Sequence, residues 1–506
     1  MIRRAALLAA ALALVAAGCS ATPSGQADGA PTGGGRTVAG GQADVPADVD
    51  SALTDKLDSH WQADDAVLGA VRTIELGGGS VEIDAPGAYR LTGTLSDGQV
   101  KVAVETKGLV QLVLDGAHVT SSTSAAINVA QADEVVIVLA DGSVNTLTDA
   151  ETYAEPDTEP DAALFSKADL SIAGGGALTV RGRAGDAIAS KDGLVIAGGQ
   201  LTVEAADDGV KGRDYLRVAG GEVTVAAGGD GLKSTNADDA GAGYVLLEGG
   251  AVTIEADSDC VDAATDALVT ATTAFLACGD DAIHGDARLV MDGGEVEVKR
   301  SFEGLEAPVL VLAGGRLNVV ASDDGLNAAA STSSGEDGEP AAPGRPGGGG
   351  RGGGRMGVQD GVTLVITGGV VTIEAGSDGI DSNGPGAIAG GTVTVYAPAN
   401  GMNGPFDIAE GGPVVTGGVV TAYGTSGGRG AIISPDAGST QAWLAAAFEA
   451  AGGGALTLAD AAGRQIAVLE PNQAVSAVVF SSPDLADGDQ YSLTADGVSL
   501  TVTAGQ

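Results

Sequence analysis

The segment Gly-Gly-Gln-Leu-Thr-Val at residues 198–203 is repeated as Gly-Gly-Glu-Val-Thr-Val at residues 220–225. The same pattern, two glycines followed by a short β-branched run, begins again at residues 249, 293, 314, 368 and 390. The starts at 198 and 220 lie 22 residues apart, as do those at 368 and 390, and the 44 residues between 249 and 293 predict one degenerate repeat. A fixed period of this length indicates a stack of similar units.

The residues within each repeat predict a strand and a corner. Alternating apolar residues and threonines favour β-strands, and paired glycines supply the positive φ that a sharp corner requires. A unit this small cannot bury its own apolar face, so it must stack on its neighbours. Helical repeats are excluded because apolar spacings of three and four are missing between the glycines, and a propeller blade would be longer. The sequence therefore predicts an all-β, right-handed single-stranded parallel β-helix that begins near Arg72.

Departures from the period divide the rest of the chain. Residues 20–64 have no hydrophobic period and predict a disordered tether. The β-helix is assigned to residues 65–435, with a flexible glycine-rich insertion at 331–357. The pattern changes in residues 436–506, which predict a C-terminal cap in which 442–450 form a short helix followed by strands.

The N-terminus predicts export. Arg3 and Arg4 precede an apolar run at residues 5–17 that is too short to span a bilayer, which is typical of a secretory signal. The sequence Val-Ala-Ala-Gly-Cys at 15–19 ends the signal segment of residues 1–19 and resembles a bacterial lipobox, which implies that Cys19 is lipidated and becomes the mature N-terminus. We therefore expect a protein anchored by its lipid to the outer face of the bacterial cytoplasmic membrane or to the cell surface.

Composition restricts the partners. A net charge of −42 argues against nucleic acid and against direct contact with anionic membrane surfaces, and favours cations or neutral polymers. Membrane contact is expected only through the lipid. Cys260 and Cys278 are the cysteines that remain after Cys19, and an oxidising compartment permits either a disulfide or two free thiols.

An acidic residue, or its amide, recurs at one corner of nine repeats. These residues are Asp186, Asp208, Asp230, Asp259, Asp281, Glu303, Asp324, Asp378 and Asn400. Stacked strands place equivalent residues roughly 4.8 Å apart, and two carboxylates at that distance repel by roughly 3 kcal/mol at an effective dielectric constant of about 20. Lys211 and Lys233 follow Asp208 and Asp230 by three residues and are expected to neutralise that part of the column.

The sequence between Lys233 and Arg288 contains neither lysine nor arginine, although seven aspartates lie between 257 and 286. A divalent cation would relieve the repulsion, and oxygen ligands at variable spacing suit calcium best. The candidate metal ligands are Asp207, Asp208, Asp230, Asp257, Asp259, Asp262, Asp280, Asp281, Asp323, Asp324, Asp378 and Asp381. For any single repeat the alternative is turn formation, because Asp-Gly is also a turn dipeptide; both interpretations stay open at 323–324 and 378–381.

Several further motifs resemble a known family. They are Gly-Ala-Tyr-Arg-Leu-Thr-Gly-Thr-Leu-Ser-Asp-Gly-Gln at 87–99, Asn-Thr-Leu-Thr-Asp at 145–149, Ala-Leu-Phe-Ser-Lys-Ala-Asp-Leu at 163–170, Asp-Asp-Gly-Val-Lys-Gly-Arg-Asp at 207–214, Gly-Asp-Gly-Leu-Lys-Ser at 229–234 and Ser-Ser-Pro-Asp-Leu at 481–485. From about Ala70 onward the chain resembles the carbohydrate-binding family typified by a clostridial cellulose- and pectin-binding β-helix protein. The resemblance implies a calcium-containing β-helix, similar in shape to pectate lyases, that binds plant-type polysaccharides without established catalysis. The chain departs from the family at Cys260 and Ala282, where glycine is usual, and at Glu303, where aspartate is usual.

Three functions follow from these observations. The leading one is a surface-anchored protein that binds extracellular polysaccharide, with Lys211, Lys233, Tyr215 and Tyr244 as candidate substrate contacts; Phe302, Tyr396 and Tyr423 are further aromatic candidates. The second is a polysaccharide lyase of the pectate type, which needs a base of lowered pKa, whereas acids three residues away should raise the pKa of both lysines. The third is a structural adhesin. His60, His118 and His284 fit no recognisable catalytic motif, so no catalytic residue is assigned.

Overall fold

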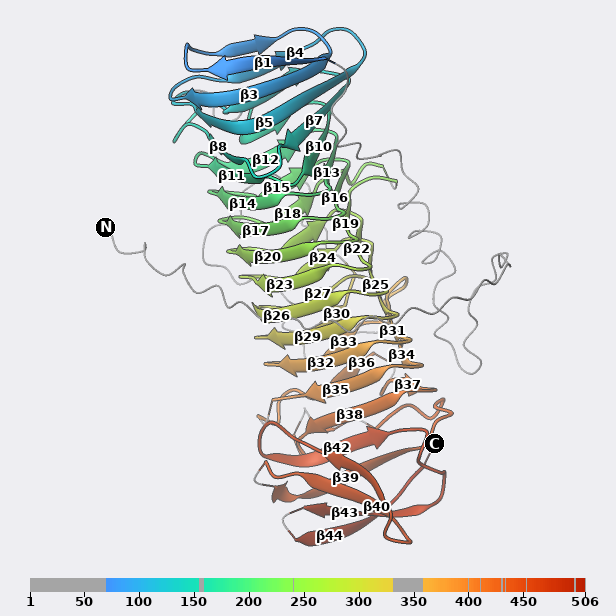
Figure 1. The fold of residues 1–506 in the computed structure, drawn as a ribbon. Helices are drawn as coiled ribbons and strands as arrows, with labels where there is room; N and C mark the ends of the chain where they lie inside the picture. The colour runs from blue at the N-terminus through green and yellow to red at the C-terminus, as the bar shows by residue number, and fades with distance from the viewer. Residues whose placement is uncertain are drawn as a thin grey trace, which may run out of the picture. The chain divides into compact units, whose positions relative to one another are not determined.

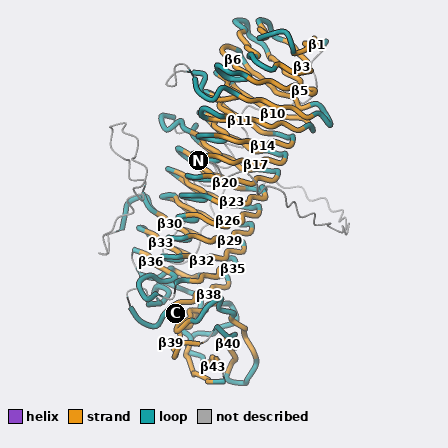
Figure 2. The backbone as a smooth tube through the Cα atoms, turned by 90° about the vertical axis from the view of Figure 1, so that its left-hand side faces the viewer, coloured by secondary structure: helices purple, strands orange, loops and turns teal. Residues whose placement is uncertain are grey.

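Strands form where the period predicts them, and the strands of successive repeats pair in parallel orientation. The computed structural model describes residues 70–153, 159–239, 241–330, 358–398, 400–409, 411–428, 431–432, 434–451, 453–495 and 497–505. The predictions for the signal segment, Cys19, the tether and the insertion at 331–357 fall outside these residues. Throughout the described chain the secondary structure consists of strands and loops (Figure 2), and no helix in it is long and apolar enough to cross a membrane.

Each repeat contributes one strand to each of three parallel ladders (Figure 1). The first ladder contains β1 (Val71–Leu76), β7 (Glu134–Leu139), β10 (Asp169–Gly174), β13 (Gly193–Ile196), β16 (Tyr215–Val218), β19 (Tyr244–Leu247), β22 (Asp266–Val269), β25 (Arg288–Met291), β28 (Val309–Leu312), β31 (Thr363–Ile366), β34 (Gly386–Ile388) and β37 (Val414–Val415). The second ladder contains β8 (Val144–Thr148), β11 (Ala177–Gly182), β14 (Gln200–Ala205), β17 (Glu222–Ala227), β20 (Ala251–Ala256), β23 (Thr273–Ala277), β26 (Glu295–Ser301), β29 (Arg316–Ala321), β32 (Val370–Ala375), β35 (Thr392–Tyr396) and β38 (Val419–Gly424). The first and second ladders belong to one large sheet. The long strands β3 (Gly87–Leu95) and β5 (Leu109–Thr120) lie in its N-terminal part, where β5 pairs with both β7 and β8.

The third ladder forms a separate sheet and carries the candidate site. Its strands are β2 (Val81–Ile83), β4 (Val100–Ala103), β6 (Ile127–Gln131), β9 (Ala162–Ser166), β12 (Asp186–Ser190), β15 (Val210–Gly212), β18 (Leu232–Ser234), β21 (Val261–Ala263), β24 (Ile283–Gly285), β27 (Leu305–Glu306), β30 (Leu326–Ala328), β33 (Ile380–Ser382) and β36 (Phe406–Ile408). These strands are short, and in most of them one apolar residue enters the core and the next faces outward. The all-β prediction with long parallel sheets is confirmed, and β22, β23 and β24 form the degenerate repeat between 249 and 293.

Apolar side chains of all three ladders meet in one continuous core. Val252 and Ile254 of β20 are buried, whereas Ala251, Thr253 and Glu255 are exposed, as expected for a strand with one face in the core. The first ladder differs because several of its strands, such as β13, β19 and β22, are buried on both faces. Tyr244, Leu246, Leu268, Val290 and Val311 form a second apolar cluster, separate from the main core.

The C-terminal region corrects one prediction. Residues 443–451 form strand β39 (Trp443–Ala451) and not a helix. β39 pairs with β42 (Val475–Ser481), and β42 pairs with β38, both in antiparallel orientation. β42 covers the edge of β38, and β39 in turn covers the open edge of β42; this pairing outweighs the helix propensity of the alanine-rich run, because an uncovered edge would leave backbone groups unpaired. A four-stranded antiparallel sheet follows, with β40 (Leu456–Asp460), β41 (Gln465–Leu469), β43 (Gln490–Ala495) and β44 (Val498–Thr503).

The last corner of the acidic column is also corrected. The sequence pattern aligns Asn400 with Asp378, but β36 pairs with β33 so that Phe406 lies beside Ile380. The backbone N–H of Gly404 donates to Asp378 Oδ1 at 2.6 Å and therefore occupies the corner position. The pattern Asn-Gly-Met-Asn resembled the repeat, but the register of an adjacent strand decided the alignment.

Candidate functional site

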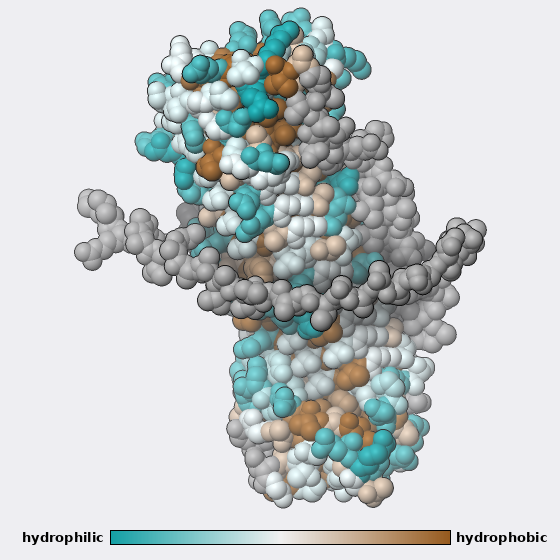
Figure 3. Space-filling model, in the orientation of Figure 1, coloured by the Kyte–Doolittle hydropathy of each residue, from teal (hydrophilic) through white to brown (hydrophobic). Residues whose placement is uncertain are grey.

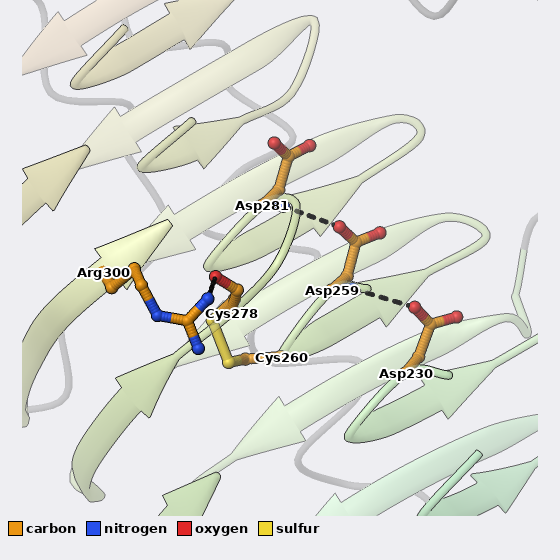
Figure 4. Close-up of a disulfide and its surroundings, with 6 residues drawn as sticks. All are labelled: Asp230, Asp259, Cys260, Cys278, Asp281 and Arg300. Carbon is orange, nitrogen blue, oxygen red and sulfur yellow. Dashed lines mark hydrogen bonds between the residues drawn. A yellow bond between two sulfur atoms is a disulfide. The ribbon is translucent and has the colours of Figure 1, made fainter. Parts of the chain in front are cut away.

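The corner residues lie between the second and third ladders, where the chain turns from one sheet to the next. In four successive repeats, the carboxylate Oδ1 accepts the backbone N–H of the equivalent residue one repeat further on. The N···Oδ1 distances are 3.1 Å from Asp208 to Asp186, 3.0 Å from Asp230 to Asp208, 3.0 Å from Asp259 to Asp230 and 2.7 Å from Asp281 to Asp259. Figure 4 shows Asp230, Asp259 and Asp281 joined in this way.

This hydrogen bond is compatible with both roles considered for the aspartates, turn formation and metal binding. One carboxylate oxygen satisfies a backbone donor at the corner, which is a structural role of the kind expected from a turn residue. The same geometry aligns the carboxylates along the stack and leaves Oδ2 available for other partners. Asp324 repeats the arrangement with the N–H of Asp378 at 2.7 Å.

A second polar column runs beside the corners on the outward face of the third ladder. Its residues are paired in register from strand to strand and comprise Lys211, Lys233, Asp262, His284, Glu306, Asn327, Asp381 and Asp407. The column changes from basic to predominantly acidic after Lys233, which divides the site into two parts.

In the first part the lysines neutralise the aspartates, as predicted. Lys211 Nζ contacts Asp186 and lies 3.1 Å from Asp208 Oδ2. Lys233 Nζ contacts Asp230 and lies 3.0 Å from Asp262 Oδ2. Burial lowers the pKa of each lysine, but the neighbouring carboxylates raise it by more, so the net shift is upward. Both lysines therefore stay protonated.

In the second part buried carboxyl groups accumulate without such partners. Burial, and then repulsion by nearby carboxylates such as Asp230, raises the pKa of Asp259 to about 9. Burial, followed by interaction with Glu306, raises the pKa of Asp281 to about 9. Burial and neighbouring acids also raise the pKa of Glu303 to about 8 and that of Glu306 to about 7. Within the described chain, no lysine or arginine forms an ion pair with any of these four residues.

Asp281 and Glu306 lie close together where no lysine or arginine of the described residues neutralises them. Interaction between these two carboxyl groups is among the causes that raise the pKa of Asp281, so Asp281 holds its proton more firmly beside Glu306. His284 lies nearby, with Nδ1 3.6 Å from Asp262 Oδ1 and Nε2 3.8 Å from Asp286 Oδ1. The cluster therefore needs protons or a cation to be stable.

Four groups of side chains bring potential ligand atoms within 4.8 Å of one another in the part of the chain that the structure describes. They are Asp259–Asp280–Asp281, Asp281–Glu303–Glu306, Asp259–Asp262–His284 and Asp186–Asp207–Asp208. The first two offer only carboxylate oxygens, which are hard ligands suited to calcium. These residues fit a calcium ion because binding would supply the charge that the buried carboxyl groups lack.

The remaining predicted ligands are placed differently. Asp230 forms an ion pair with Lys233. Asp257 is exposed and belongs to none of the four groups. Asp324 and Asp381 have pKa values raised to about 8 by burial and acidic neighbours, and that of Asp378 is raised to about 6. These three residues, together with Asp323, join no group of three ligands within the described residues.

Glu303 and Glu306 were not among the predicted ligands. The available signal was the spacing: Glu303 and Glu306 are three residues apart, as are Asp259 and Asp262. Glu303 was recognised as a corner residue equivalent to these aspartates, but neither it nor Glu306 was assigned as a ligand.

The aromatic predictions are corrected in part. The rings of Tyr215 and Tyr244 stack with centroids 5.4 Å apart, but Tyr244 is buried in the second apolar cluster. Tyr244 therefore offers no ring face to a sugar, while Tyr215 is half-buried beside it. Tyr396 and Tyr423 stack in the same way next to the C-terminal strands, where Tyr423 is buried.

Comparisons with known proteins find a matching family model, a relative and a solved structure. The family model described as "Carbohydrate-binding domain-containing protein" matches residues 77–339. A protein of that description from Acetivibrio thermocellus is 48% identical over 185 residues, which cover 36% of this chain and 65% of the relative. The chain thus spans slightly less than two thirds of that relative's length. A solved structure of a polysaccharide lyase-like protein from C. thermocellum, a gadolinium derivative, is 31% identical and covers 45% of this chain and 94% of its own, with a TM-score of 0.39.

Proposed function

Because this chain belongs to the carbohydrate-binding domain-containing protein family, we propose that it binds extracellular polysaccharide of the cellulose or pectin type, with calcium held by its stacked carboxylates, and catalyses no reaction. The observation that carries the proposal is the group of buried, unneutralised carboxyl groups at Asp259, Asp281, Glu303 and Glu306. A calcium ion would be held by Asp259, Asp280 and Asp281, or by Asp281, Glu303 and Glu306. It would supply positive charge to the outward face of the third ladder.

Calcium would also explain how such an acidic protein attracts pectate. Carboxylates on the protein and on the polysaccharide repel each other, but a bound cation reverses the local charge. We therefore propose that pectate binding depends on calcium. Neutral polysaccharide has no such requirement.

We propose that the three ladders form a right-handed parallel β-helix of the pectate lyase type, capped by residues 436–506. The predicted lipobox at Cys19 would anchor the protein to the outer face of the cytoplasmic membrane or to the cell surface, with residues 20–64 as a tether. Fluorescence microscopy and detergent partitioning of the full-length protein and of a Cys19→Ala variant test the anchor. Release of the variant into the medium is the expected result, and an unchanged membrane fraction would contradict it.

The lysine environment weighs against a lyase. Proton abstraction beside a uronate carboxylate needs a base that loses its own proton near neutral pH. Lys211 and Lys233 are each held by two carboxylates, which raise their pKa values. Incubation with polygalacturonate and calcium should therefore yield no unsaturated product, and rising absorbance from such products would overturn this part of the proposal.

Calcium-dependent pulldown tests the binding function. The wild-type protein should be retained by immobilised polygalacturonate in calcium and released by chelator. Asp281→Asn should weaken retention at least about tenfold, because it removes a ligand shared by two of the groups. Asp257→Asn is the matched control, since Asp257 is exposed and outside them. Equal retention with and without chelator would exclude a calcium bridge, and no retention on any acidic or neutral polysaccharide would exclude the function.

A further inference from the structure

The outward face of the second ladder carries a regular column of small polar side chains. Residues at the same position of successive strands pair in register from β11 to β38. In order they are Thr179, Thr202, Thr224, Thr253, Phe275, Glu297, Asn318, Thr372, Thr394 and Thr421. Threonine is common on exposed strands, so most of this column needs no functional explanation.

Phe275 is the exception within the column. Its side chain occupies a threonine position on β23 and is 46% exposed. The inward residues of the strand, Ala274 and Leu276, are buried and already fill the core at this level. Packing therefore does not require an aromatic ring at residue 275. In the view of Figure 3, hydrophobic side chains form separate patches on a mostly polar surface.

The neighbours of Phe275 offer hydrogen-bonding groups on both sides of the ring. Thr253 and Glu297 flank it in register, at the strand spacing of roughly 4.8 Å. Asn318 Nδ2 donates to Glu297 Oε2 at 2.9 Å, and Lys299 Nζ lies 2.6 Å from Glu297 Oε1. These contacts hold the Glu297 carboxylate in place beside the ring. An apolar ring bordered by a hydroxyl, a carboxylate and an amide matches the apolar faces and hydroxyl edges of a pyranose.

Charge decides which class of polysaccharide fits. Glu255 and Glu295 are exposed on the strands beside and around Phe275, and Glu297 is half-buried. Three cations lie among them: Lys299 pairs with Glu297, Arg316 lies 4.0 Å from Glu295, and Arg300 donates to the carbonyl oxygen of Cys278. The three acids and three cations balance, so this surface has no net positive charge to attract uronates and suits uncharged sugars.

We propose that Phe275 is the stacking platform of a binding face for neutral polysaccharide, with Thr253, Glu297 and Asn318 holding the hydroxyls of the stacked sugar. This inference rests on the proposed polysaccharide binding but not on calcium, because the face lies on the second ladder and not on the acidic third ladder. The protein then has two separate binding faces: a calcium-dependent one for pectate and a calcium-independent one for neutral chains.

Retention on insoluble cellulose in chelator tests the proposal with the full chain. Phe275→Ala should weaken retention at least about tenfold, whereas Phe275→Trp should retain binding because it keeps a stacking ring. Val498→Ala is the matched control, since Val498 is 73% exposed and lies on β44 of the separate C-terminal sheet. Thermal unfolding of each variant checks the fold, which an exposed side chain should affect little.

The outcomes separate this inference from the proposed function. If wild-type protein binds cellulose and Phe275→Ala binds equally well, the face is wrong and the function stands. If Phe275→Ala loses polygalacturonate binding but keeps cellulose binding, the assignment to neutral polysaccharide is wrong. If wild-type protein binds neither polymer, both proposals fail.

Discussion

At the scale of single residues, the corner aspartates show how one side chain combines two roles. Oδ1 accepts a backbone N–H from the next repeat, and Oδ2 is left to meet a lysine or other positive charge. Lys233 is the last lysine of the column and contacts both Asp230 and Asp262. Its side chain is only 26% exposed, so solvent screens these contacts less than it would on an open surface.

Replacing Lys233 should therefore be costly. Lys233→Met removes the positive charge and leaves two carboxylates at close range, which should lower the free energy of unfolding by roughly 3 kcal/mol. Lys299→Met is the control, because Lys299 is 62% exposed and its pair with Glu297 should contribute at most about 1 kcal/mol. Urea denaturation followed by circular dichroism measures both. Equal losses in the two variants would show that Lys233 does not stabilise the column.

At the scale of the elements, the paired glycines determine how closely one repeat lies on the next. Gly250 has a φ of 74°, in the region that favours glycine. A Cβ added there would lie 2.5 Å from the carbonyl oxygen of Gly221, the equivalent glycine of the preceding repeat. The corner therefore needs glycine both for its backbone conformation and for the spacing of the stack.

A pair of substitutions separates these two needs. Gly463 also has a positive φ, of 80°, but nothing lies within 4 Å of its added Cβ. Gly463→Ala should cost only the backbone strain, about 1–2 kcal/mol. Gly250→Ala should cost a further 1–3 kcal/mol, about the size of an overpacked contact. Chemical denaturation of both variants gives the comparison, and a Gly250→Ala that is no worse than Gly463→Ala would exclude the close approach.

A disulfide reinforces the same part of the stack. Cys260 and Cys278 are bridged, which settles the alternative that the sequence left open, and both are buried beside the corners of Asp259 and Asp281 (Figure 4). Arg300 Nη1 also donates to the carbonyl oxygen of Cys278 at 2.9 Å. The bridge closes a segment with a sequence separation of 18, close to one repeat.

Removing the bridge should destabilise the protein mainly by freeing the unfolded chain. For a loop of this size the double variant Cys260→Ala/Cys278→Ala should lose about 3 kcal/mol. Reductant should lower the unfolding midpoint of the wild-type protein under denaturing conditions and leave that of the double variant unchanged. The same response to reductant in both proteins would argue against the bridge.

At the scale of the whole molecule, the acidic column links stability to protons and cations. Asp259, Asp281, Glu303, Asp324 and Asp381 have pKa values raised to between about 8 and about 9, mainly by burial. Unfolding would return each group to its ordinary pKa near 4. Between these values the folded protein binds more protons than the unfolded chain, so the free energy of unfolding falls as pH rises.

In chelator, stability should therefore decrease from about pH 5 to pH 9, by several kcal/mol in total. Calcium should flatten this dependence, because a bound cation stabilises the ionised carboxylates. Denaturation midpoints at several pH values, with calcium and with chelator, measure the effect. A chelated protein that is equally stable at pH 5 and pH 9 would contradict the linkage, and Asp281→Asn should weaken it.

The sequence by itself determined the repeat, the all-β class and the column of acids, because glycine pairs and alternating apolar residues are local signals that recur at a fixed spacing. Only the tertiary structure decided which acids share a site, since Glu303 and Glu306 meet Asp281 across a repeat boundary. It also decided that 443–451 form a strand, that Tyr244 is buried and that Phe275 is exposed. These outcomes depend on pairing and packing between distant segments, which local propensity does not contain.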